Sequence, residues 1–389
     1  MKIAFIRGPF LNPWEVQTYA PLLARHDFKL IGADWQFYKH PMKNMPERIQ
    51  TPHVWASGSA RIHPALPVAL NRLRSWTMGE SYGLEDLETA VGDAELLHTA
   101  ETYTTMTYQC LEIRKRRHCK VIATVWENIP HMGETHPRRR ARKQSALHEL
   151  DGFLAVTETS RQMLLEEGAP ADRIEVISMA VDLERFKPMS KDPAWVQDWR
   201  LSPEEKVVLF VGRLVEEKGI RELLKAIPEV LSRIRVPVRF CFAGAGPLER
   251  DIRAAAARHR DRIQLIPFVP YDQLPTLHNM ADLFVLPSKP APKWQEQFGY
   301  VLAESMACGK SIVTTRSGSI PDVVGKAATL VPPGNASALA CTIVELLDSE
   351  SWRTQMGAAA RRHAEMNFDA DKNARRIESF YQRVLHPSP

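Results

Sequence analysis

Short apolar runs alternate with helical stretches along this chain, and this alternation restricts the fold more than any other feature. The first run, 2–7, is broken by Gly8-Pro9 and followed by a predicted helix, 15–25, and a second run, 28–33. A strand, a glycine turn, a helix and a strand form the opening of a doubly wound domain with a parallel sheet. The same order starts again with a strand predicted at 206–211, so we expect an α/β fold in two domains.

The length and composition of the chain are sufficient for two such domains. Of its 389 residues, 44% are hydrophobic, which is ample for two separate cores. Residues 189–204 include Pro193 and Pro203 and are predicted to form a linker before the second domain begins.

Positive charge is concentrated in the first part of the chain. Residues 1–150 hold 20 Lys or Arg and 15 Asp or Glu, which accounts for the whole net charge of +5. Ten of these bases fall within 114–143, where the acids are Glu127 and Glu134. A solvated basic surface is the simplest explanation, and a patch for anionic lipid headgroups or an anionic acceptor is the alternative. Nucleic acid is not expected as a partner, because aromatic residues are not interleaved with the basic run.

The cysteines and the apolar runs bear on the cellular compartment in which the protein is expected. The five cysteines form no Cys-x-x-Cys pair, which argues for reduced thiols in a cytosol and against a zinc site. The apolar run at the N-terminus is too short for a signal peptide, and no stretch approaches the roughly 20 apolar residues of a membrane-spanning helix. We therefore expect a cytoplasmic protein, with the basic run suited to peripheral contact with the inner face of a membrane.

The stretch 296–309 contains the strongest signal for chemistry. Glu296 and Glu304 lie eight positions apart, and a short helix is predicted from Tyr300 to Cys308. On a continuous helix the two carboxylates would be about 12 Å apart, which suits groups that bind opposite ends of an elongated ligand. The Phe298-Gly299 pair at the helix start offers free backbone N–H groups and a positive dipole end, which favour phosphate. By itself, such a glutamate pair is also common on a solvated helix face.

The letters EQFGYVLAESMACGK around this pair resemble the signature of the family 4 glycosyltransferases. GRLVEEKG at 212–219 resembles the diphosphate-binding segment of that family, and SMAVDLERFKP at 178–188 resembles its passage between domains. The resemblance implies a retaining enzyme of the GT-B fold, with two Rossmann-like domains and the active site in the cleft between them. It also implies a nucleoside diphosphate sugar, UDP- or GDP-linked, as donor, and neither a cofactor nor a metal. The implied domains are 1–185, 186–368 and a final helix, 369–389, that crosses back to the first.

The resemblance assigns roles to individual residues of the second domain. Arg213 and Lys218 would neutralise the departing diphosphate, an electrostatic contribution that is usually the largest in catalysis. Glu296 would contact the donor sugar and Glu304 the ribose hydroxyls. The complete predicted donor-binding set is Gly8, Gly212, Arg213, Lys218, Val269, Glu296, Phe298, Gly299, Tyr300, Val301 and Glu304.

One position departs from the family pattern. After the strand predicted at 120–125, many relatives place a histidine near the donor sugar, and here that position is Trp126. Glu127, Asn128 and His131 follow it and could contact the sugar or the acceptor. Glu127 is the preferred catalytic candidate, while capping of the loop by Glu127 and an exposed His131 are the structural alternatives.

We therefore predict transfer of a sugar to an acceptor hydroxyl, in glycan, glycolipid or glycoconjugate biosynthesis. Residues 34–95 are expected to carry acceptor-specific loops, but they do not identify the acceptor. A sugar-nucleotide epimerase of the same fold and a non-catalytic sugar-nucleotide-binding protein remain as alternatives. Only the transferase would release nucleotide in an acceptor-dependent way.

Overall fold

The computed structural model describes residues 1–34, 49–50, 83–134, 136–259 and 261–387. The chain forms two compact units: unit 1 comprises Met1–Ala180 and Ala370–Pro389, and unit 2 comprises Val181–Asp369. The first boundary therefore follows Ala180 rather than residue 185. Much of the region expected to carry acceptor loops, 35–48 and 51–82, lies outside the described residues.

Unit 1 is built on a sheet whose neighbouring strands all run parallel. Its strands are β1 (Lys2–Gly8), β2 (Asp27–Gly32), β3 (Ile49–Gln50), β4 (Leu96–Ala100), β5 (Lys120–Val125), β6 (Gly152–Ala155) and β7 (Ile174–Val176). Their spatial order is β3-β2-β1-β4-β5-β6-β7, so the chain order reverses between β1 and β4. The near-continuous burial of β1 and β5 is typical of parallel strands with both faces covered.

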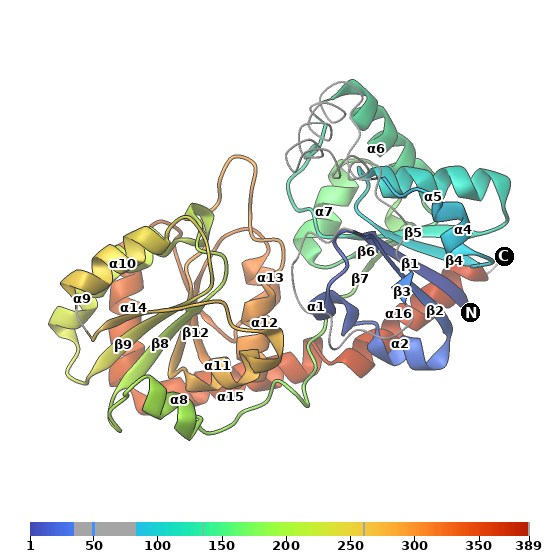
Figure 1. Cartoon of the computed structure of the whole chain (residues 1–389). Coiled ribbons are helices and arrows are strands. Elements are labelled where there is room, and N and C mark those ends of the chain that lie inside the picture. The colour runs from blue at the N-terminus through green and yellow to red at the C-terminus, as the bar shows by residue number, and fades with distance from the viewer. Residues whose placement is uncertain (35–48, 51–82, 135, 260, 388–389) are drawn as a thin grey trace, which may run out of the picture. The chain divides into compact units, whose positions relative to one another are not determined.

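Helices cover both faces of this sheet (Figure 1). They are α1 (Pro13–Val16), α2 (Ala20–Arg25), α4 (Leu87–Val91), α5 (Thr105–Arg116), α6 (Pro137–Glu149), α7 (Glu158–Glu166) and α16 (Ala370–Leu385), with a short 3-10 turn η1 (Ala171–Arg173). Residues of α4 to α7 share one hydrophobic core with β1, β4, β5 and β6. The last helix, α16, packs beside α2 and belongs to unit 1.

The single helix predicted at 15–25 is wrong, because two shorter helices stand there. Helix α1 is capped by Asn12, whose side chain accepts a hydrogen bond from the Glu15 amide. Helix α2 starts anew at Ala20, with Pro21 in its first turn. Proline has no N–H for a hydrogen bond to the preceding turn, so it favours the start of a helix over its interior.

Unit 2 repeats the design with a second parallel sheet. Its strands are β8 (Lys206–Val211), β9 (Val238–Ala243), β10 (Ile263–Ile266), β11 (Leu283–Leu286), β12 (Ser311–Thr315) and β13 (Thr329–Val331). The spatial order is β10-β9-β8-β11-β12-β13, which reverses between β8 and β11. The prediction of two Rossmann-like, doubly wound α/β domains is confirmed.

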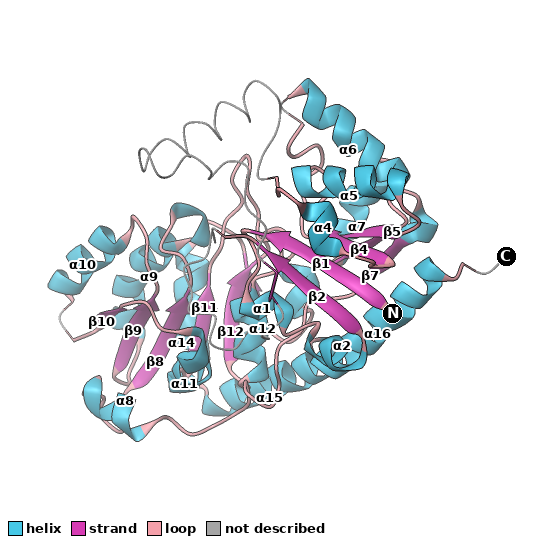
Figure 2. Ribbon diagram, turned by 45° about the vertical axis from the view of Figure 1, so that its right-hand side comes forward, coloured by secondary structure: helices cyan, strands magenta, loops and turns pink. Residues whose placement is uncertain are grey.

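Helices also lie on both faces of the second sheet (Figure 2). They are α8 (Pro193–Asp198), α9 (Ile220–Arg233), α10 (Glu249–Arg258), α11 (Leu274–Met280), α12 (Tyr300–Ala307), α13 (Ile320–Val324), α14 (Ala336–Asp348) and α15 (Glu350–Asn367), with 3-10 turns η2 (Glu216–Lys218) and η3 (Tyr271–Gln273). Helix α9 packs against α14, and α12 packs against α15.

The segment predicted as a linker, 189–204, is a structured part of unit 2. It contains α8, which Asp192 caps by accepting hydrogen bonds from the Ala194 and Trp195 amides. Lys191 forms an ion pair of 2.6 Å with Asp282, which directly precedes β11. Proline at the start of α8 is compatible with a helix, so Pro193 marks a helix start here.

In the part of the chain that the structure describes, no helix combines the length and the apolar character needed to cross a membrane.

Candidate functional site

The carboxyl ends of β8 and β11 form the switch point of the second sheet. In open parallel sheets, ligands bind outside the strand ends where the order reverses. Here Gly212 and Arg213 directly follow β8, and Ser288 comes two residues after β11. The predicted diphosphate-binding segment therefore stands at the place where this fold puts ligands.

A short polar network joins the two loops at this switch point. Lys218 Nζ lies 2.6 Å from Glu296 Oε2, and Ser288 Oγ donates a hydrogen bond of 2.9 Å to the same oxygen. Lys218 Nζ also lies 5.1 Å from the centre of the Trp294 ring. The ion pair is largely enclosed, with side-chain exposures of 12% for Lys218 and 7% for Glu296. Ser288 was not a sequence candidate, since one serine in a loop carries no distinctive signal.

Two glycines permit the close approach of these loops. Gly219, at φ +71°, has no room for a Cβ atom, which would meet the Pro287 carbonyl oxygen at 1.8 Å. Gly318, at φ +53°, is equally restricted, because its Cβ would lie 2.4 Å from the Glu296 carbonyl oxygen. The Ser319 amide donates to that oxygen at 2.8 Å. Backbone packing therefore fixes the position of Glu296, in addition to the ion pair that Glu296 forms with Lys218.

Arg213 extends from the same edge of unit 2 into solvent. Its side chain is 61% exposed, and its Nη2 lies 3.4 Å from Glu217 Oε1. An exposed ion pair of this kind contributes little stability, so the guanidinium can turn to an anionic ligand at small cost. Arg213 therefore differs from Lys218, whose ammonium is already held by a buried carboxylate.

Helix α12 starts as predicted, at Tyr300, and ends at Ala307, with Gly309 in the left-handed region at φ +67° directly after its cap. Gly299 is the N-cap residue at φ +75°. Phe298 is 1% exposed as a residue, and its ring centre lies 5.7 Å from that of Phe368, so its side chain belongs to the core of unit 2. Glu296 precedes the helix, and the helical spacing considered for the two glutamates does not apply.

Glu304 lies inside unit 2, opposite a histidine that the sequence analysis did not select. Its side chain is 2% exposed, and its Oε2 lies 3.4 Å from Nε2 of His278 on α11. A histidine within a mostly apolar helix is usually a core residue, so its pairing with Glu304 becomes visible only in the fold. The predicted contact of Glu304 with ribose stays a prediction.

The other predicted donor-binding residues occupy different places. Val301 lies in the first turn of α12, and Val269 is half-buried in the loop after β10. Gly8 lies at the end of β1 in unit 1, where its φ is +53° and an added Cβ would meet Met106 Sδ at 2.7 Å. Packing against Met106 explains this glycine without a ligand.

The corresponding edge of unit 1 carries two carboxyl groups close together. Glu101 follows β4, and its Oε1 accepts hydrogen bonds from the amides of Trp126, at 2.9 Å, and Glu127, at 3.2 Å. Glu127 is 5% exposed, and its own Oε1 accepts from the Asn128 and Ile129 amides, both at 3.0 Å. Glu127 therefore caps its loop, as the structural alternative proposed.

These two carboxyl groups hold protons more tightly than free ones. Burial, and then the nearby Glu127 carboxylate, raise the pKa of Glu101 to about 8. Burial also raises the pKa of Glu127, against the opposing effect of the Ile129 and Asn128 amides. Glu101 Oε2 is enclosed and has no hydrogen-bond partner among the described residues. The sequence analysis missed Glu101, because nothing in the chain order places it beside Glu127.

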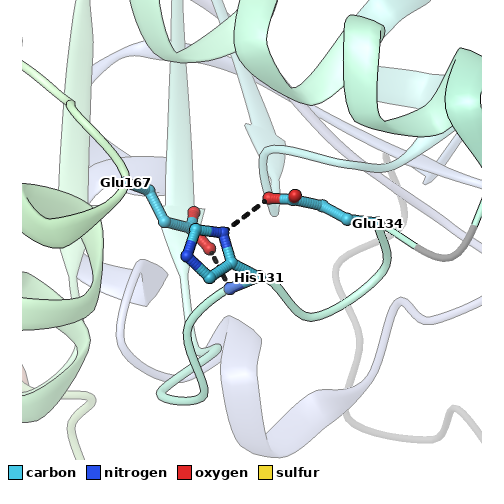
Figure 3. Close-up of side chains that lie close together, drawn as sticks. All are labelled: His131, Glu134 and Glu167. Carbon is cyan, nitrogen blue, oxygen red and sulfur yellow. Dashed lines mark hydrogen bonds and ion pairs between the residues drawn. The ribbon is translucent and has the colours of Figure 1, made fainter.

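His131 lies on the same loop and belongs to a second polar cluster, together with Glu134 and with Glu167 at the end of α7 (Figure 3). Its backbone amide donates to Glu167 Oε1 at 2.7 Å, and its Nδ1 lies 3.2 Å from Glu134 Oε1. One candidate metal-ligand atom of each of these three residues lies within 4.8 Å of the others. However, the buried ammonium of Lys143 already forms ion pairs with Glu134 and Glu167. A metal ion would have to displace that ammonium, and the prediction of no metal site remains a prediction.

In the folded protein, acidic residues from outside the basic run, 114–143, lie beside several of its bases and reduce its local net charge. Arg114 and Lys120 pair with Asp151, and Arg116 pairs with Glu88. The run also divides, because 114–120 connects α5 to the start of β5, whereas the residues after 137 begin α6, beyond the opposite end of that strand. At the start of α6, Arg138 and Arg140 are exposed and Arg139 is half-buried, and Arg140 Nε lies 3.4 Å from Glu134 Oε2.

Two family profiles match this chain. "Glycosyl transferases group 1" matches residues 191–363, and "Glycosyltransferase Family 4" matches residues 11–185.

Individual relatives agree with these profiles. The D-inositol 3-phosphate glycosyltransferase of Mycolicibacterium smegmatis is 32% identical over 65% of this chain and 59% of its own length. The GDP-mannose-dependent alpha-(1-6)-phosphatidylinositol monomannoside mannosyltransferase of the same organism is 29% identical over 56% of this chain and 58% of its own length. This chain therefore covers less than two thirds of either relative.

Solved structures share the fold. The crystal structure of Anabaena HepE in complex with UDP has a TM-score of 0.75 at 16% identity, covering 98% of this chain and 100% of the other. The same protein has also been solved with UDP-glucose. At this level of identity the likeness concerns the fold.

Proposed function

Because this chain belongs to the group 1, family 4 glycosyltransferases, we propose that it transfers a sugar from a nucleoside diphosphate sugar to an acceptor hydroxyl, with retention of the anomeric configuration. The observation that carries the proposal is the Lys218–Glu296 ion pair at the switch point of unit 2, with Ser288 on the same carboxylate oxygen. The product would belong to a glycan, a glycolipid or another glycoconjugate.

Each group at this site has a task in the proposed transfer. The bond between the anomeric carbon and the diphosphate oxygen breaks, and its electron pair leaves with the diphosphate. Lys218 and Arg213 stabilise the charge that develops there, Arg213 after its exposed guanidinium has turned from Glu217 to the diphosphate. The acceptor oxygen forms the new bond on the same face of the sugar, and its proton passes to the leaving phosphate oxygen. Glu296, held by Lys218 and Ser288, contacts the hydroxyl groups of the donor sugar.

UDP and GDP are the nucleotides we propose for the donor. One solved structure of this fold carries UDP, and one relative is named as GDP-mannose-dependent. Charge neutralisation by Lys218 and Arg213 would need no bound metal, and we propose a metal-independent reaction. Excess chelator should then leave turnover unchanged.

Incubation with a panel of sugar nucleotides, with and without candidate hydroxyl acceptors, tests the proposed function. Acceptor-dependent release of the nucleoside diphosphate is expected. Interconversion of the donor sugar without an acceptor would instead identify an epimerase. Binding without any turnover across the panel would favour a non-catalytic protein, and absence of nucleotide binding would reject all three functions.

In unit 1, we propose that Glu127 and the neighbouring Trp126, Asn128 and His131 act on the acceptor or the donor sugar. Glu127→Gln and His131→Ala should impair transfer and spare binding of the nucleoside diphosphate. Glu127→Gln should have the larger effect, because its carboxyl is buried and its pKa is raised, whereas His131 is 66% exposed. Steady-state assays on both variants measure this, and normal kinetics in both would assign the segment a structural role.

We also propose a cytoplasmic location and peripheral contact with an anionic membrane face. All five cysteines are free thiols, as expected in a reducing compartment. Within 114–143, the start of α6 is the part we propose for the membrane, since three arginines, Arg138, Arg139 and Arg140, follow one another there and two of them are exposed.

A further inference from the structure

His278 and Glu304 form an enclosed pair in unit 2 that the proposed mechanism has not used. His278 is fully buried on α11, and Glu304 is 1% exposed on α12. His278 Nε2 lies 3.4 Å from Glu304 Oε2. Among the described residues neither atom has a hydrogen-bond partner, so the two atoms face each other at ion-pair distance without the geometry of a hydrogen bond.

Of the groups around the His278 ring described below, only the Glu304 carboxylate can form a polar interaction with it. Its ring lies between Phe186, at a centroid distance of 6.2 Å, and Phe284, at 5.4 Å. Aromatic rings offer neither a charge nor a strong acceptor to an imidazole N–H. A buried carboxylate without a donor is costly, so the Glu304 oxygen that faces His278 is stabilised most simply by the Nε2–H group.

We infer that His278 is a positioning residue, which holds the enclosed oxygen Oε2 of Glu304 through Nε2–H and leaves the other oxygen, Oε1, for the ribose hydroxyls of the donor nucleotide. This inference rests on the proposed function, in which Glu304 is the ribose contact. In this inference the two carboxylate oxygens have different roles. Oε2 is enclosed in unit 2 and faces His278, and Oε1 accepts hydrogen bonds from the ribose hydroxyls. A carboxylate held at one oxygen has one orientation, and this orientation gives selectivity for a ribose over a deoxyribose.

The test compares a ribonucleotide with its deoxy counterpart. Calorimetry measures the affinity of UDP or GDP, whichever binds more tightly, and of the corresponding 2′-deoxynucleoside diphosphate. For the wild-type protein we expect a preference for the ribonucleotide of roughly 10-fold or more, the value of one hydrogen bond to a charged group. Glu304→Ala should reduce this preference to about 1, because the acceptor is lost.

The variants of His278 separate positioning from packing. His278→Phe keeps a ring but removes the donor, and it should lower the preference at least about threefold. His278→Gln carries an amide N–H at the level of Nε2 and should keep the preference within about twofold. His278→Asn is polar but too short to reach Glu304, and it replaces His278→Phe if that variant does not fold. The matched control is His363→Phe, since the half-buried His363 bonds to the Val323 carbonyl and to no carboxylate.

The outcomes distinguish the inference from its premise. If Glu304→Ala leaves the ribose preference unchanged, or no nucleoside diphosphate binds, the proposed donor site fails and the inference fails with it. If Glu304→Ala abolishes the preference while His278→Phe and His278→Asn keep it in full, only the positioning role is overturned. A loss in the His278 variants that His278→Gln restores, with His363→Phe unaffected, supports positioning.

Discussion

Because Lys218 and Glu296 form an ion pair, the effect on stability of replacing either residue depends on the charge that the other one keeps. The ion pair is largely enclosed, and removal of one partner leaves a buried charge without compensation, at a cost on the order of 3 kcal/mol. A loss of activity in a Lys218 variant therefore has two sources, which kinetics alone do not separate. Arg213 is 61% exposed and lacks this complication.

Arg213→Ala and Lys218→Ala should each lower turnover by on the order of 100-fold or more, because each removes a charge that stabilises the leaving diphosphate. Arg213→Ala should leave the free energy of unfolding within about 0.5 kcal/mol of the wild-type value, whereas Lys218→Ala should reduce it. Steady-state transfer assays and denaturant unfolding measure the two effects. Wild-type turnover in a folded variant would remove that residue from the diphosphate site.

Glu101 links the stability of the protein to pH. The pKa of Glu101 is raised from its ordinary value of 4.5 to about 8 in the folded protein. Between these two pH values the carboxyl group is protonated in the folded state and ionised in the unfolded state. Across this window the folded state binds more protons, and stability falls as pH rises, by at most about 1.4 kcal/mol per pH unit. Glu101→Gln removes this dependence and keeps an oxygen for the Trp126 and Glu127 amides.

The Glu101→Gln variant should therefore be more stable than the wild type at pH 8, and the difference should shrink toward pH 5. Urea unfolding at several pH values measures the slope of the unfolding free energy for both proteins. The exposed Glu85→Gln serves as the control, and its slope should match that of the wild type. An unchanged slope in Glu101→Gln would assign the proton to another group.

At the level of elements, the sequence predicted what depends on local pattern. The strands at 120–125 and 206–211 and the start of α12 at Tyr300 are as expected, because buried apolar runs and a glycine cap are local signals. Pairings across the chain were not predictable in this way. Glu101 meets the Glu127 amide, and His278 meets Glu304, only because parallel strands and neighbouring helices bring distant segments together.

The basic run shows the same limit in electrostatic terms. Along the chain, its ten bases have two acids among them, but the fold supplies Glu88, Glu149 and Asp151 from outside the run. Charge density in one segment therefore overstates the field at the surface. In α6, Arg140 and the buried Lys143 are paired with Glu134, so the segment that we propose for contact with an anionic membrane is limited to Arg138, Arg139 and the exposed side of Arg140.

Vesicles that contain anionic lipid should bind the protein at low salt through Arg138, Arg139 and Arg140. Replacing all three by Gln should abolish co-sedimentation. The triple replacement of Arg114, Arg116 and Lys120 should have a smaller effect, because these residues are not part of α6. Binding should fade with salt as the Debye length falls to about 3 Å at 1 M. Absence of binding at low salt would mean that the bases of α6 form an ordinary solvated surface.

At the level of the whole molecule, the chain leaves unit 1 after Ala180 and returns to it at Ala370. The two crossing points are adjacent, because Val181 pairs with Asp369 in a parallel bridge. Helix α16 is fixed to unit 1 by a buried contact, in which the Tyr381 hydroxyl lies 2.6 Å from His98 Nδ1. Each unit thus has its own sheet and its own helices, and the predicted donor-binding residues other than Gly8 all lie in unit 2.

A nucleoside diphosphate alone should therefore protect unit 2 and leave the strands of unit 1 unchanged. Hydrogen exchange of the full chain, with and without saturating UDP or GDP, should show slower exchange at 212–219 and 288–304. At a ligand concentration of 100 times Kd, binding stabilises the unit that holds the ligand by about 2.7 kcal/mol. Arg213→Ala should weaken this protection at a fixed nucleotide concentration, whereas Glu127→Gln in unit 1 should not. Protection confined to unit 1, or equal protection by a nucleoside without its diphosphate, would contradict a diphosphate site between β8 and β11.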